Sequence, residues 1–397
     1  MRPESARPWA GGSEPASPDR PHVVFVLGGL GMGGAEAQLT SLLEAGRHVW
    51  SGWRVTILTL TTRQDPTLVR RLSALGVRLA TVDRGAVRFP VFFARLYGWL
   101  RRARPDLVHT MLGGSTGTWG RFAARLAGVP RIVHSDRSLA PIRTPWQRRL
   151  EPLANRLTDR FLTNATAVAE RLAVEGVAPD RIRVVRNGVD LDRFDAGDGA
   201  GFRHAWGVAD DAVVAGFLGM LRPEKRPDLL LDAVMRVPEG RRPSLIAIAG
   251  DGELMEPLRA RVASDPWLRA HVRLLGVVAD TPDFLAAIDV LVLTSDTEGL
   301  PNAVIEAMAA GVPCIATRVS DVPDLVSDNG FVIDPGDASA LASALERVVR
   351  LDRSARAELG RNGRARAEAD FDLTRAAERF EAQHQQLLRD VAVRGRA

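Results

Sequence analysis

The sequence predicts an α/β protein made of two doubly wound domains that face each other across a cleft. The chain has 397 residues, which is more than one ordinary core holds, so two domains of roughly 150 to 200 residues are expected. Short apolar runs alternate with helical stretches along the chain, a pattern typical of parallel α/β architecture. The alternation is interrupted once, by the polar and turn-rich segment NGVDLDRFDAGDGA at 187–200, and then begins again.

The first half is expected to hold seven strands separated by helices. Each strand is a short run rich in aliphatic and β-branched residues, such as HVVFVL at 22–27. We expect strands at 22–27, 54–60, 77–82, 107–111, 131–134, 160–163 and 182–185. We expect helices at about 35–47, 66–74, 89–103, 116–127, 146–157 and 166–175.

The second half repeats the pattern and ends in charged helices. Strands are expected at 213–218, 244–249, 272–275, 290–293 and 313–316. We therefore expect an N-terminal domain at 22–195, a C-terminal domain at 196–372 and a last helical segment at 373–397. In doubly wound sheets ligands bind beyond the carboxyl ends of the strands, which places the expected site in the cleft.

Composition restricts the class of protein. Residues 1–21 are rich in Pro, Gly, Ser and Ala and predict a disordered tail without the apolar stretch of a signal peptide. No apolar run approaches the ~18 residues that a membrane-spanning helix needs. The single cysteine, Cys314, excludes an internal disulfide, and a reducing cytoplasm fits. The net charge of +5 favours anionic partners such as phosphates, anionic lipid or nucleic acid, or else reflects an arginine-rich composition.

The most informative segment is SDTEGLPNAVIEAMAAGVP at 295–313. It follows an expected strand and contains a helix start, and a helix N-terminus after a strand is a ready anion site. Two carboxylates, Glu298 and Glu306, lie in it eight positions apart. Two acids do not suit a ligand that is only a phosphate. They suit a ligand that also carries hydroxyl groups, as a nucleotide sugar does.

A glycine-rich loop, GGLGMGGAE at 28–36, follows the first expected strand. Its glycines fit the dinucleotide pattern G-x-G-x-x-G, but the second strand ends in LTLTT at 58–62 without the acid that would hold a ribose. A dinucleotide cofactor is therefore disfavoured. Backbone amides of such a loop can still approach a phosphate closely, and a plain tight turn between strand and helix is the structural alternative.

Taken in order, these segments resemble the large family of retaining glycosyltransferases with nucleotide-sugar donors known as family 4, or group 1. The resemblance runs from about residue 22 to 390. Its motifs are GMGGAE at 31–36, PDLVH at 105–109, NGVDLDRF at 187–194, LRPEK at 221–225, AGDGE at 249–253 and EGLPNAVIEAMAAGVP at 298–313. It implies the GT-B fold of two Rossmann-like domains, with the acceptor on the N-terminal domain, the donor on the C-terminal domain and a last helix that packs back on the first.

The resemblance also implies roles for single residues. Glu306 falls on the acid that the family sets against the donor's ribose hydroxyls, and Glu298 on the acid beside the transferred sugar. Lys225 falls on the lysine that neutralises the departing diphosphate, whose negative charge grows in the transition state. The expected donor-binding set is completed by Gly33, Gly34, Arg222, Gly299, Leu300 and Asn302. Asn302 is also expected to cap the helix that follows, either for the ligand or for the fold alone.

The chain departs from the family pattern at two places. Met220 stands where many members have an arginine that grips the diphosphate, and Arg222 is the candidate to replace it. After the fifth strand many members carry a histidine near the reacting carbon, whereas the segment VHSDR at 133–137 puts Asp136 or Arg137 there. We assign Asp136 to the catalytic set on this basis.

The remaining histidines and acids are interpreted as structural residues, or their role is left undecided between structure and function. His134 is expected to end a strand as a structural residue, and His109 belongs either to the core or to the acceptor cleft. Asp190 and Asp192 have D-x-D spacing but lie in the expected linker, where turn chemistry explains them. We therefore expect no metal and no resident cofactor, with Lys225 and helix N-termini supplying the positive field.

The expected activity is transfer of a sugar, with retention, from a UDP- or GDP-linked donor to a glycan, lipid-linked or small-molecule acceptor. The alternatives are a nucleotide-sugar epimerase or hydrolase on the same fold, and a catalytically impaired homologue that binds glycans or nucleotides. A nucleic-acid partner is disfavoured because the arginines are scattered without interleaved aromatics. Basic, aromatic stretches at 88–102 and 146–149 fit either an anionic membrane surface or ordinary helices with a charged outer face. The expected location is the cytoplasm, with peripheral contact at the inner face of the membrane as an open option.

Overall fold

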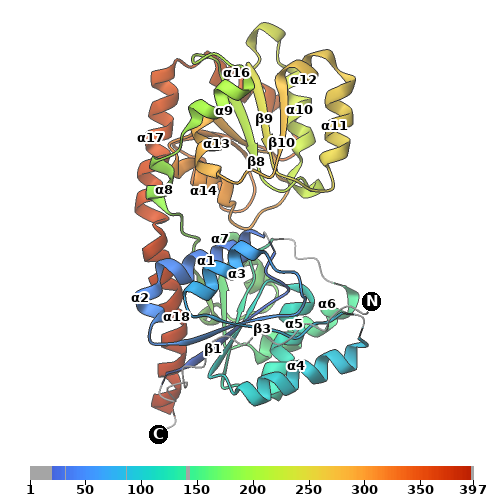
Figure 1. The fold of residues 1–397 in the computed structure, drawn as a ribbon, viewed down its shortest axis with the longest axis vertical. Helices are drawn as coiled ribbons and strands as arrows, with labels where there is room; N and C mark the ends of the chain where they lie inside the picture. Colours follow the sequence, from blue (N-terminus) through green and yellow to red (C-terminus); the bar gives the residue numbers. More distant parts are fainter. Residues whose placement is uncertain (1–19, 32, 86, 140–143, 395–397) are drawn as a thin grey trace, which may run out of the picture.

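The computed structural model describes residues 20–31, 33–85, 87–139 and 144–394, so the expected disordered tail lies almost entirely outside the described residues. Two parallel sheets form the framework (Figure 1). The first has the order β3-β2-β1-β4-β5-β6-β7 and the second the order β10-β9-β8-β11-β12-β13. Each sheet with its helices is called here the N-terminal or the C-terminal domain. The predicted fold class, two doubly wound Rossmann-like domains, is confirmed.

The strands of the N-terminal domain are β1 (His22–Leu27), β2 (Arg54–Thr59), β3 (Arg78–Thr81), β4 (Leu107–Met111), β5 (Arg131–Ser135), β6 (Arg160–Thr163) and β7 (Ile182–Val184). Its helices are α1 (Gly34–Ala45), α2 (Arg47–Trp50), α3 (Pro66–Ala74), α4 (Phe89–Ala103), α5 (Gly114–Leu126), α6 (Pro145–Leu157), α7 (Thr166–Val174) and the short η1 (Pro179–Arg181). One core joins α4 and α5 to one face of the sheet through residues such as Phe92, Leu96 and Ala123. The opposite face packs against α1 and the C-terminal helix.

The strands of the C-terminal domain are β8 (Val214–Leu218), β9 (Leu245–Ala249), β10 (Val272–Gly276), β11 (Val290–Leu293), β12 (Cys314–Thr317) and β13 (Gly330–Ile333). Its helices are α8 (Leu191–Asp195), α9 (Gly199–Trp206), η2 (Pro223–Lys225), α10 (Pro227–Arg236), η3 (Glu239–Arg241), α11 (Met255–Ser264), α12 (Pro266–His271), α13 (Thr281–Ala287), α14 (Asn302–Ala309), α15 (Val322–Val326), α16 (Ala338–Arg350) and α17 (Arg353–Asp370). Helices α10 and α16 share a core on one face, and α13 and α14 belong to the core on the other. Cys314 is fully buried in β12, and this burial raises the pKa of its thiol to about 12.

Two differences from the expected elements have clear physical causes. The edge strand β13 was not expected, because its apolar run, FVI at 331–333, is only three residues long and is followed at once by Asp334. The expected linker at 187–200 contains α8, whose Phe194 is buried in the core of the C-terminal domain. Its helical character comes from this packing, which local turn propensity cannot reveal.

The chain passes between the domains at two places that lie side by side. The first is the segment after β7, and the second joins α17 to α18 (Leu373–Arg394). Val189 and Asp372 form an isolated parallel bridge there, and the Val189 amide donates to the Phe371 carbonyl at 2.8 Å. From this point α18 runs along the N-terminal domain and contacts α1 and α2 (Figure 1).

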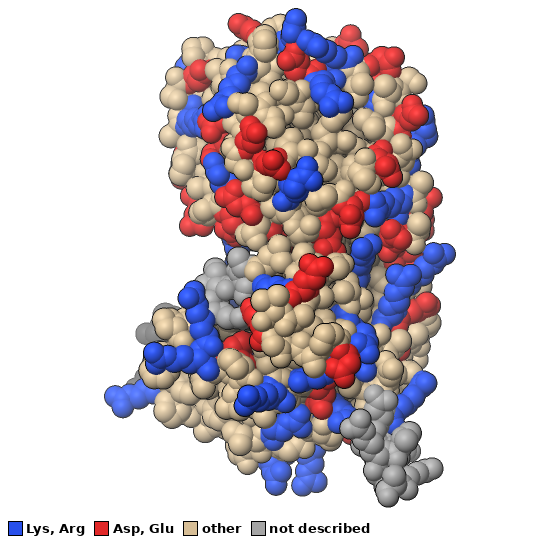
Figure 2. Space-filling view, turned by 180° about the vertical axis from the view of Figure 1, so that it is seen from behind, with Lys and Arg blue, Asp and Glu red and all other residues tan. Residues whose placement is uncertain are grey.

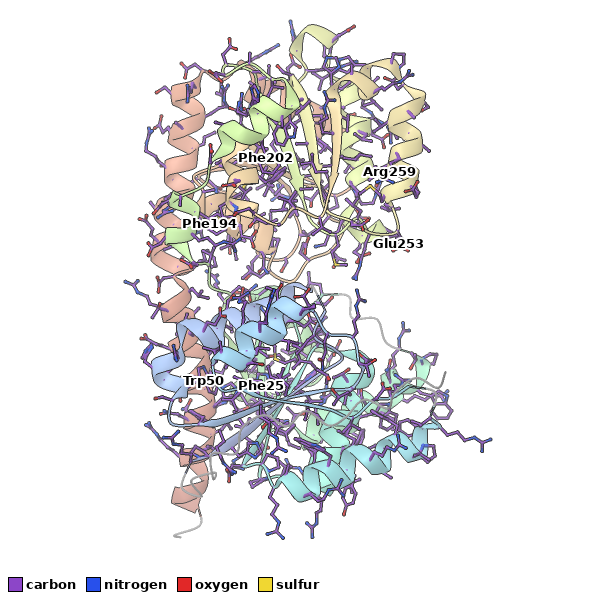
Figure 3. All side chains as sticks on the ribbon, in the orientation of Figure 1. Phe25, Trp50, Phe194, Phe202, Glu253 and Arg259 are labelled. Carbon is purple, nitrogen blue, oxygen red and sulfur yellow. The ribbon has the colours of Figure 1, made fainter. Side chains whose placement is uncertain are left out.

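Helix α18 is held to the N-terminal sheet by aromatic packing and a directed chain of hydrogen bonds. The ring of Phe25 in β1 packs against those of Trp50 and Phe380, with ring centroids 5.8 and 6.1 Å away; Figure 3 labels Phe25 and Trp50. His384 Nδ1 donates to the Phe380 carbonyl at 2.8 Å, so in the neutral ring its Nε2 must accept from His109 Nδ1 at 2.9 Å. His109 Nε2 then accepts from the Ser135 hydroxyl at 2.8 Å. His109 therefore belongs to the core beneath α18, not to the cleft.

We predict that acid loosens this attachment. Burial lowers the pKa of His384 to about 4 and that of His109 well below its usual value. The folded state keeps the rings neutral, whereas the unfolded chain protonates them near pH 6.5. The stabilisation is therefore complete above about pH 6.5 and is lost as the pH falls towards 4, by about 3 kcal/mol for His384 alone.

The measurement is urea unfolding at a series of pH values. His384→Phe is expected to be less stable at neutral pH but to lose less stability on acidification than the parent protein. His48→Gln is the matched control, because His48 is exposed and only contacts Glu378 at 3.2 Å. An unchanged pH slope in His384→Phe would rule this histidine out as the source.

Among the described residues, no helix is both long enough and apolar enough to cross a membrane.

Candidate functional site

The candidate site lies at the carboxyl end of the C-terminal sheet, where strand order reverses. Strand β8 has β9 on one side and β11 on the other, so the loops after β8 and β11 leave the sheet in opposite directions. The loop after β8 carries Lys225 and the loop after β11 carries Glu298. This edge of the domain faces the N-terminal domain, and Figure 3 labels Glu253 on it.

Backbone contacts hold these loops against one another. Gly219 N donates to Ala249 O and Leu221 N to Asp251 O, both at 3.0 Å. At Gly250, whose φ is +142°, a Cβ would lie 1.8 Å from the Gly219 carbonyl oxygen, so only glycine permits this approach. The AGDGE motif therefore shapes the floor of the site.

Lys225 and Glu298 form an ion pair within the site. Glu298 is 9% exposed, and its Oε1 accepts from Lys225 Nζ at 2.5 Å and from Ser295 Oγ at 2.6 Å. The Thr294 hydroxyl donates to the Lys225 carbonyl at 2.8 Å, which ties the two loops together. Ser295 was missed by sequence reasoning, because a serine three residues before an acid carries no signal of its own. The pair places a partly exposed cation and a buried carboxylate at one point.

The backbone at Gly299 meets the N-terminal domain directly. A Cβ on Gly299 would lie 2.1 Å from the Arg137 carbonyl oxygen and 3.2 Å from Asn164 Oδ1. The Gly299 carbonyl accepts from the Ser320 hydroxyl at 2.5 Å, and Leu300 is buried beside it. The helix start in the EGLPN motif thus forms part of the interface between the domains.

Asn302 does not have the capping role that was expected. Helix α14 begins at Asn302 itself, Pro301 occupies the N-cap position, and no side chain caps the helix. Asn302 Oδ1 instead accepts from Asn187 Nδ2 at 2.5 Å, and Asn187 Oδ1 accepts from Arg137. The prediction was wrong about the cap because the side chain reaches across to the interdomain segment. Asn302 also lies beside the glycine loop, since a Cβ on Gly34 would be 3.4 Å from its Nδ2.

Glu306 lies on the second turn of α14 and is partly buried. Loss of solvent raises its pKa to about 7, and the nearby positive charge of Arg193 opposes that rise only weakly. The carboxyl group is therefore partly protonated near neutral pH, which is the state that a buried acid adopts when no cation is bound to it.

The N-terminal side of the cleft contributes the glycine loop and a charged pair. Gly33 is the N-cap of α1, and Glu36 folds back so that a Cβ on Gly33 would lie 2.2 Å from its Oε2. Burial raises the pKa of Glu36, with Arg137 and Arg63 opposing the rise. Burial likewise lowers the pKa of Arg137 to about 10, against the attraction of Glu36. Glu36 and Arg137 were not predicted as a pair, because they lie a hundred residues apart in the sequence.

Asp321 of the C-terminal domain caps a helix of the other domain. Its carboxylate accepts from the Thr166 and Ala167 amides at 2.7 and 3.0 Å, at the start of α7. The N-cap residue of that helix, Ala165, has no side chain that could cap it. An acid at a helix N-terminus complements the helix dipole, so Asp321 stabilises the closed arrangement of the two domains.

The remaining predicted residues have partners of their own, and Arg222 shares its loop with Lys225, whose amide donates to the Arg222 carbonyl at 3.0 Å. Asp136 is buried just after β5 and accepts from Arg171 at 2.5 Å. Arg222 is about half exposed and lies 3.9 Å from Glu224, and Met220 is 40% exposed. His134 is buried, with its Nδ1 2.8 Å from the Thr110 hydroxyl.

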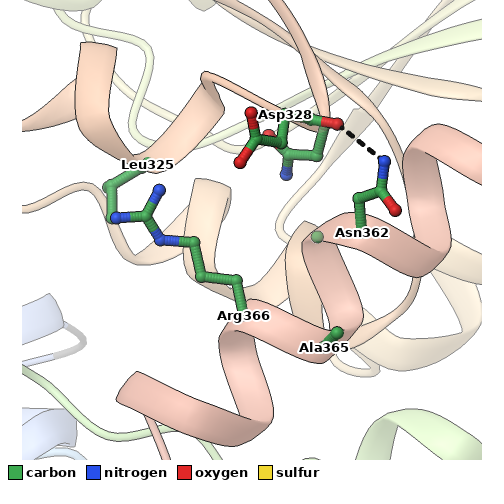
Figure 4. Close-up of a pocket in the computed structure, with 7 residues that line it drawn as sticks. Leu325, Asp328, Asn362, Ala365 and Arg366 are labelled. Atoms are coloured by element: carbon green, nitrogen blue, oxygen red, sulfur yellow. Dashed lines mark hydrogen bonds between the residues drawn. The ribbon is translucent and has the colours of Figure 1, made fainter.

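No group of three or more His, Cys, Asp or Glu side chains among the described residues is arranged to hold a metal ion. A pocket of about 350 Å³ lies between α15 and α17 and is lined by Leu325, Asp328, Asn362, Ala365 and Arg366 among others (Figure 4). Asn362 Nδ2 donates to the Asp328 carbonyl across it at 3.1 Å. None of the predicted site residues lines this pocket.

Comparison with known proteins assigns both halves of the chain to one family. Residues 212–350 match the family "Glycosyl transferases group 1", and residues 32–193 match "Glycosyltransferase Family 4". The UDP-Gal:alpha-D-GlcNAc-diphosphoundecaprenol alpha-1,3-galactosyltransferase of Escherichia coli is 35% identical over 266 residues, which cover 64% of this chain and 68% of the relative. A D-inositol 3-phosphate glycosyltransferase of Acidothermus cellulolyticus is 31% identical over 358 residues, which cover 80% and 78%. The chain spans 64% to 68% of the length of the first three curated relatives that it matches.

Solved structures share the fold at low identity. The Anabaena protein Alr3699/HepE, in complex with UDP, has a TM-score of 0.76 and 22% identity, covering 92% of this chain and 100% of that one. A glycosyltransferase from Rickettsia africae has a TM-score of 0.78 and 16% identity, covering 93% and 99%. With both sheets, the ordered motifs and these matches in agreement, the chain belongs to the group 1, or family 4, glycosyltransferases of the GT-B fold.

Proposed function

We propose that the protein transfers a sugar from a nucleoside-diphosphate sugar to a lipid-linked or other glycan acceptor, with retention at the anomeric carbon. The observation that carries this proposal is the Lys225–Glu298 ion pair at the strand-order reversal of the C-terminal sheet, next to the start of α14. A cation and a carboxylate at one point suit a ligand whose phosphates and hydroxyls are neighbours, as in a nucleotide sugar.

Each residue of the site receives a role in donor binding. Glu306 accepts hydrogen bonds from the ribose hydroxyls, and Glu298 orients the hydroxyls of the transferred sugar. The amides of Gly299 and Leu300 and those of the glycine loop at Gly33 and Gly34 face the donor. Arg222, about half exposed on the same loop as Lys225, is assigned to the diphosphate in place of the arginine that Met220 replaces.

Lys225 is assigned to the leaving group. A departing nucleoside diphosphate gains negative charge in the transition state, so a fixed cation lowers the barrier more than it strengthens ground-state binding. Lys225 is paired with Glu298 in the structure. We propose that the donor separates this pair, so that the phosphate takes the ammonium and the sugar takes the carboxylate.

Retention follows from attack on the face that the diphosphate leaves. Glu298 is already bonded to Lys225 and Ser295, which suits a carboxylate that positions the sugar better than one that attacks it. The departing phosphate accepts the proton of the acceptor hydroxyl. The closed interface at Gly299 and Asp321 limits water and hence hydrolysis. Asp136, held by Arg171, is assigned to the acceptor side, and no metal is required.

The names of relatives support a uridine donor. The E. coli relative is named for UDP-Gal, and HepE was crystallised with UDP and with UDP-glucose. The former is also named for an acceptor on diphosphoundecaprenol. We therefore propose a UDP-hexose as donor and a diphosphate-linked lipid glycan as acceptor, used from the cytoplasm at the membrane surface.

A nucleotide and nucleotide-sugar panel tests this proposal. A UDP-hexose is expected to raise the melting temperature more than a GDP-hexose, and product formation with a lipid-linked acceptor should preserve the anomeric configuration by NMR. Donor consumption without acceptor would indicate an epimerase or hydrolase instead. Binding without turnover over the acceptor panel would indicate an impaired homologue, for which Met220 is the specific reason. An inverted product would refute the retaining mechanism.

The pKa of Glu306 predicts how donor affinity depends on pH. The carboxylate form accepts both ribose hydrogen bonds, but in the free protein it forms only as the pH rises through about 7. Donor affinity is therefore expected to rise by up to tenfold per pH unit below about pH 7 and to level off above it. Glu306→Gln should bind more weakly with a flat profile. A nucleotide sugar is the right ligand for this calorimetric titration, because its phosphates do not titrate in this range. If the affinity of Glu306→Gln changed with pH as that of the parent protein does, Glu306 would be excluded from binding the ribose.

A further inference from the structure

The positive charge of the protein comes from one stretch of the chain. Residues 84–157 contain fourteen arginines and three acidic residues, which gives a formal charge of +11. The whole chain carries +5, so the remaining residues together carry −6. Charge asymmetry of this size within one chain indicates a surface for an anionic partner. The stretch contains helices α4, α5 and α6.

The three acids of this stretch do not offset the arginines at the surface. Asp136 and Glu151 are buried, in ion pairs with Arg171 and Arg121. Asp106 is partly buried and accepts from the His22 amide at 2.7 Å. The exposed arginines on α4, at its N-cap and on α6 are Arg88, Arg95, Arg101, Arg102, Arg148, Arg149 and Arg156. In Figure 2 the lower left of the molecule, where these helices lie, is mostly blue and tan.

The same helices expose an unusual share of large apolar side chains. Of the ten large hydrophobic residues that are exposed within the described part of the chain, six lie here: Phe89, Val91 and Tyr97 on α4, Leu126 on α5, and Trp146 and Leu153 on α6. Trp146 is 70% exposed. One such residue is ordinary on a protein surface, but a cluster among arginines indicates an interaction site.

The outer sides of these helices form one continuous surface, and their inner sides pack against the domain. Helix α5 packs against both α4 and α6 (Figure 1). The inner side of α4 packs into the core of the domain through the buried Phe92, Leu96 and Leu100. The outer residues are therefore not needed for packing within the domain. We call the outer side of these three helices, with the six apolar residues and seven arginines named above, the α4–α6 face.

We propose that the α4–α6 face docks on an anionic lipid bilayer. Arginines attract anionic headgroups, and aromatic side chains such as Trp146, Phe89 and Tyr97 are favourable at the level of the headgroups. Aliphatic residues beside them, Val91, Leu126 and Leu153, gain by entering the acyl boundary. Nucleic acid would use the arginines but not these aliphatic side chains, and for that reason a bilayer fits the face better.

Docking in this way orients the cleft. In a parallel sheet each following helix starts at the carboxyl end of its strand, so Phe89, the start of α5 and Trp146 lie on the cleft side of the domain. Phe89 and Trp119 meet there with ring centroids 4.4 Å apart. The cleft mouth is then held near the headgroups, which is where a lipid-linked acceptor resides; this last step rests on the proposed function, while the docking itself does not.

Vesicle co-sedimentation of the full chain tests the proposal. The probes are phosphatidylcholine vesicles with and without phosphatidylglycerol, at low and high salt. We expect binding only to the anionic vesicles, weakened by salt. The triple variant R95Q/R102Q/R148Q is expected to bind roughly a hundredfold more weakly, since each basic residue near an anionic surface contributes about fivefold. Trp146→Ala should weaken binding about tenfold and leave the salt dependence intact.

The matched control removes the same charge elsewhere. R269Q/R353Q/R361Q alters exposed arginines of the C-terminal domain and is expected to bind vesicles like the parent protein. Equal loss in both triple variants, equal binding to neutral vesicles, or tighter binding to duplex DNA than to anionic vesicles would each overturn the proposal. UDP-hexose binding measured on the same variants separates the two hypotheses: it should be unchanged in all of them, and its absence in the parent protein would refute the proposed function without touching the docking result.

Discussion

Replacing Lys225 by alanine is expected to lower kcat by roughly a hundred- to a thousandfold, which is the usual cost of removing one fixed group that stabilises developing charge. Lys225 Nζ is 2.5 Å from Glu298 Oε1, so the variant also leaves a mostly buried carboxylate without its cation. Turnover should therefore fall much more than donor affinity. Steady-state kinetics with a saturating lipid-linked acceptor measure both quantities.

Arg222→Ala is the matched control for Lys225. It removes a cation from the same loop, but one that is about half exposed, so a reduction of about tenfold or less is expected. Glu298→Ala should reduce turnover as strongly as Lys225→Ala, because the bound donor uses both groups. The two groups then act on different parts of the donor, so the double variant should lose roughly the product of the two single reductions. Near-normal turnover in Lys225→Ala or Glu298→Ala would remove this pair from the mechanism.

Removing Glu151 is expected to reduce the free energy of unfolding by about 3–5 kcal/mol, because the change leaves a buried arginine without its counterion. Arg121 is fully buried and donates to Glu151, and also to Asn155 Oδ1 at 2.8 Å and the Gly117 carbonyl at 2.9 Å. Thr118 donates to the other oxygen of Glu151 at 3.0 Å. This network joins α5 to α6. Urea unfolding of Glu151→Leu at neutral pH measures the loss.

The double variant R121M/E151L decides whether the loss comes from the unpaired charge. Replacing both partners by apolar side chains of similar size removes the desolvation cost, so much of the stability should return. A simple sum of the two single losses would mean that packing, not charge, dominates. Glu175→Gln is the control, because Glu175 forms a partly exposed ion pair with Arg171. It should lower the free energy of unfolding by less than about 1 kcal/mol.

The framework of the fold could be predicted from local patterns. Strands such as 22–27, 107–111 and 290–293 were predicted to the residue, since buried parallel strands are continuous apolar runs. The helix at 89–103 was predicted equally well, because its buried Phe92, Leu96 and Leu100 recur at helical spacing. Strand β13 gave only a weak signal, because its apolar run, FVI at 331–333, is three residues long.

The site could be predicted in its motif residues but not in its partners. Glu298 and Lys225 were named from sequence, whereas their direct contact depends on two loops that the sheet order brings together. Asn302 was expected to cap its own helix, and it instead bonds to Asn187, 115 positions away. Asp321 was missed for the same reason, since a helix cap supplied by another domain leaves no trace in the sequence around that helix. Contacts between distant segments are what local patterns do not encode.

The two segments that link the domains, at Val189 and Asp372, determine how the domains can move apart. Two chain segments that are bonded to each other side by side leave the domains a single axis of rotation, because a sliding motion would break the bridge. We therefore expect the cleft to open by a hinge rotation about these two segments. Asn187, next to the hinge, is then expected to move little, while Arg137 and Gly299 separate as the two domains rotate apart. We expect substrate entry and product release to use the same rotation, so that substitutions beside Val189 and Asp372 change its rate without touching the reacting atoms.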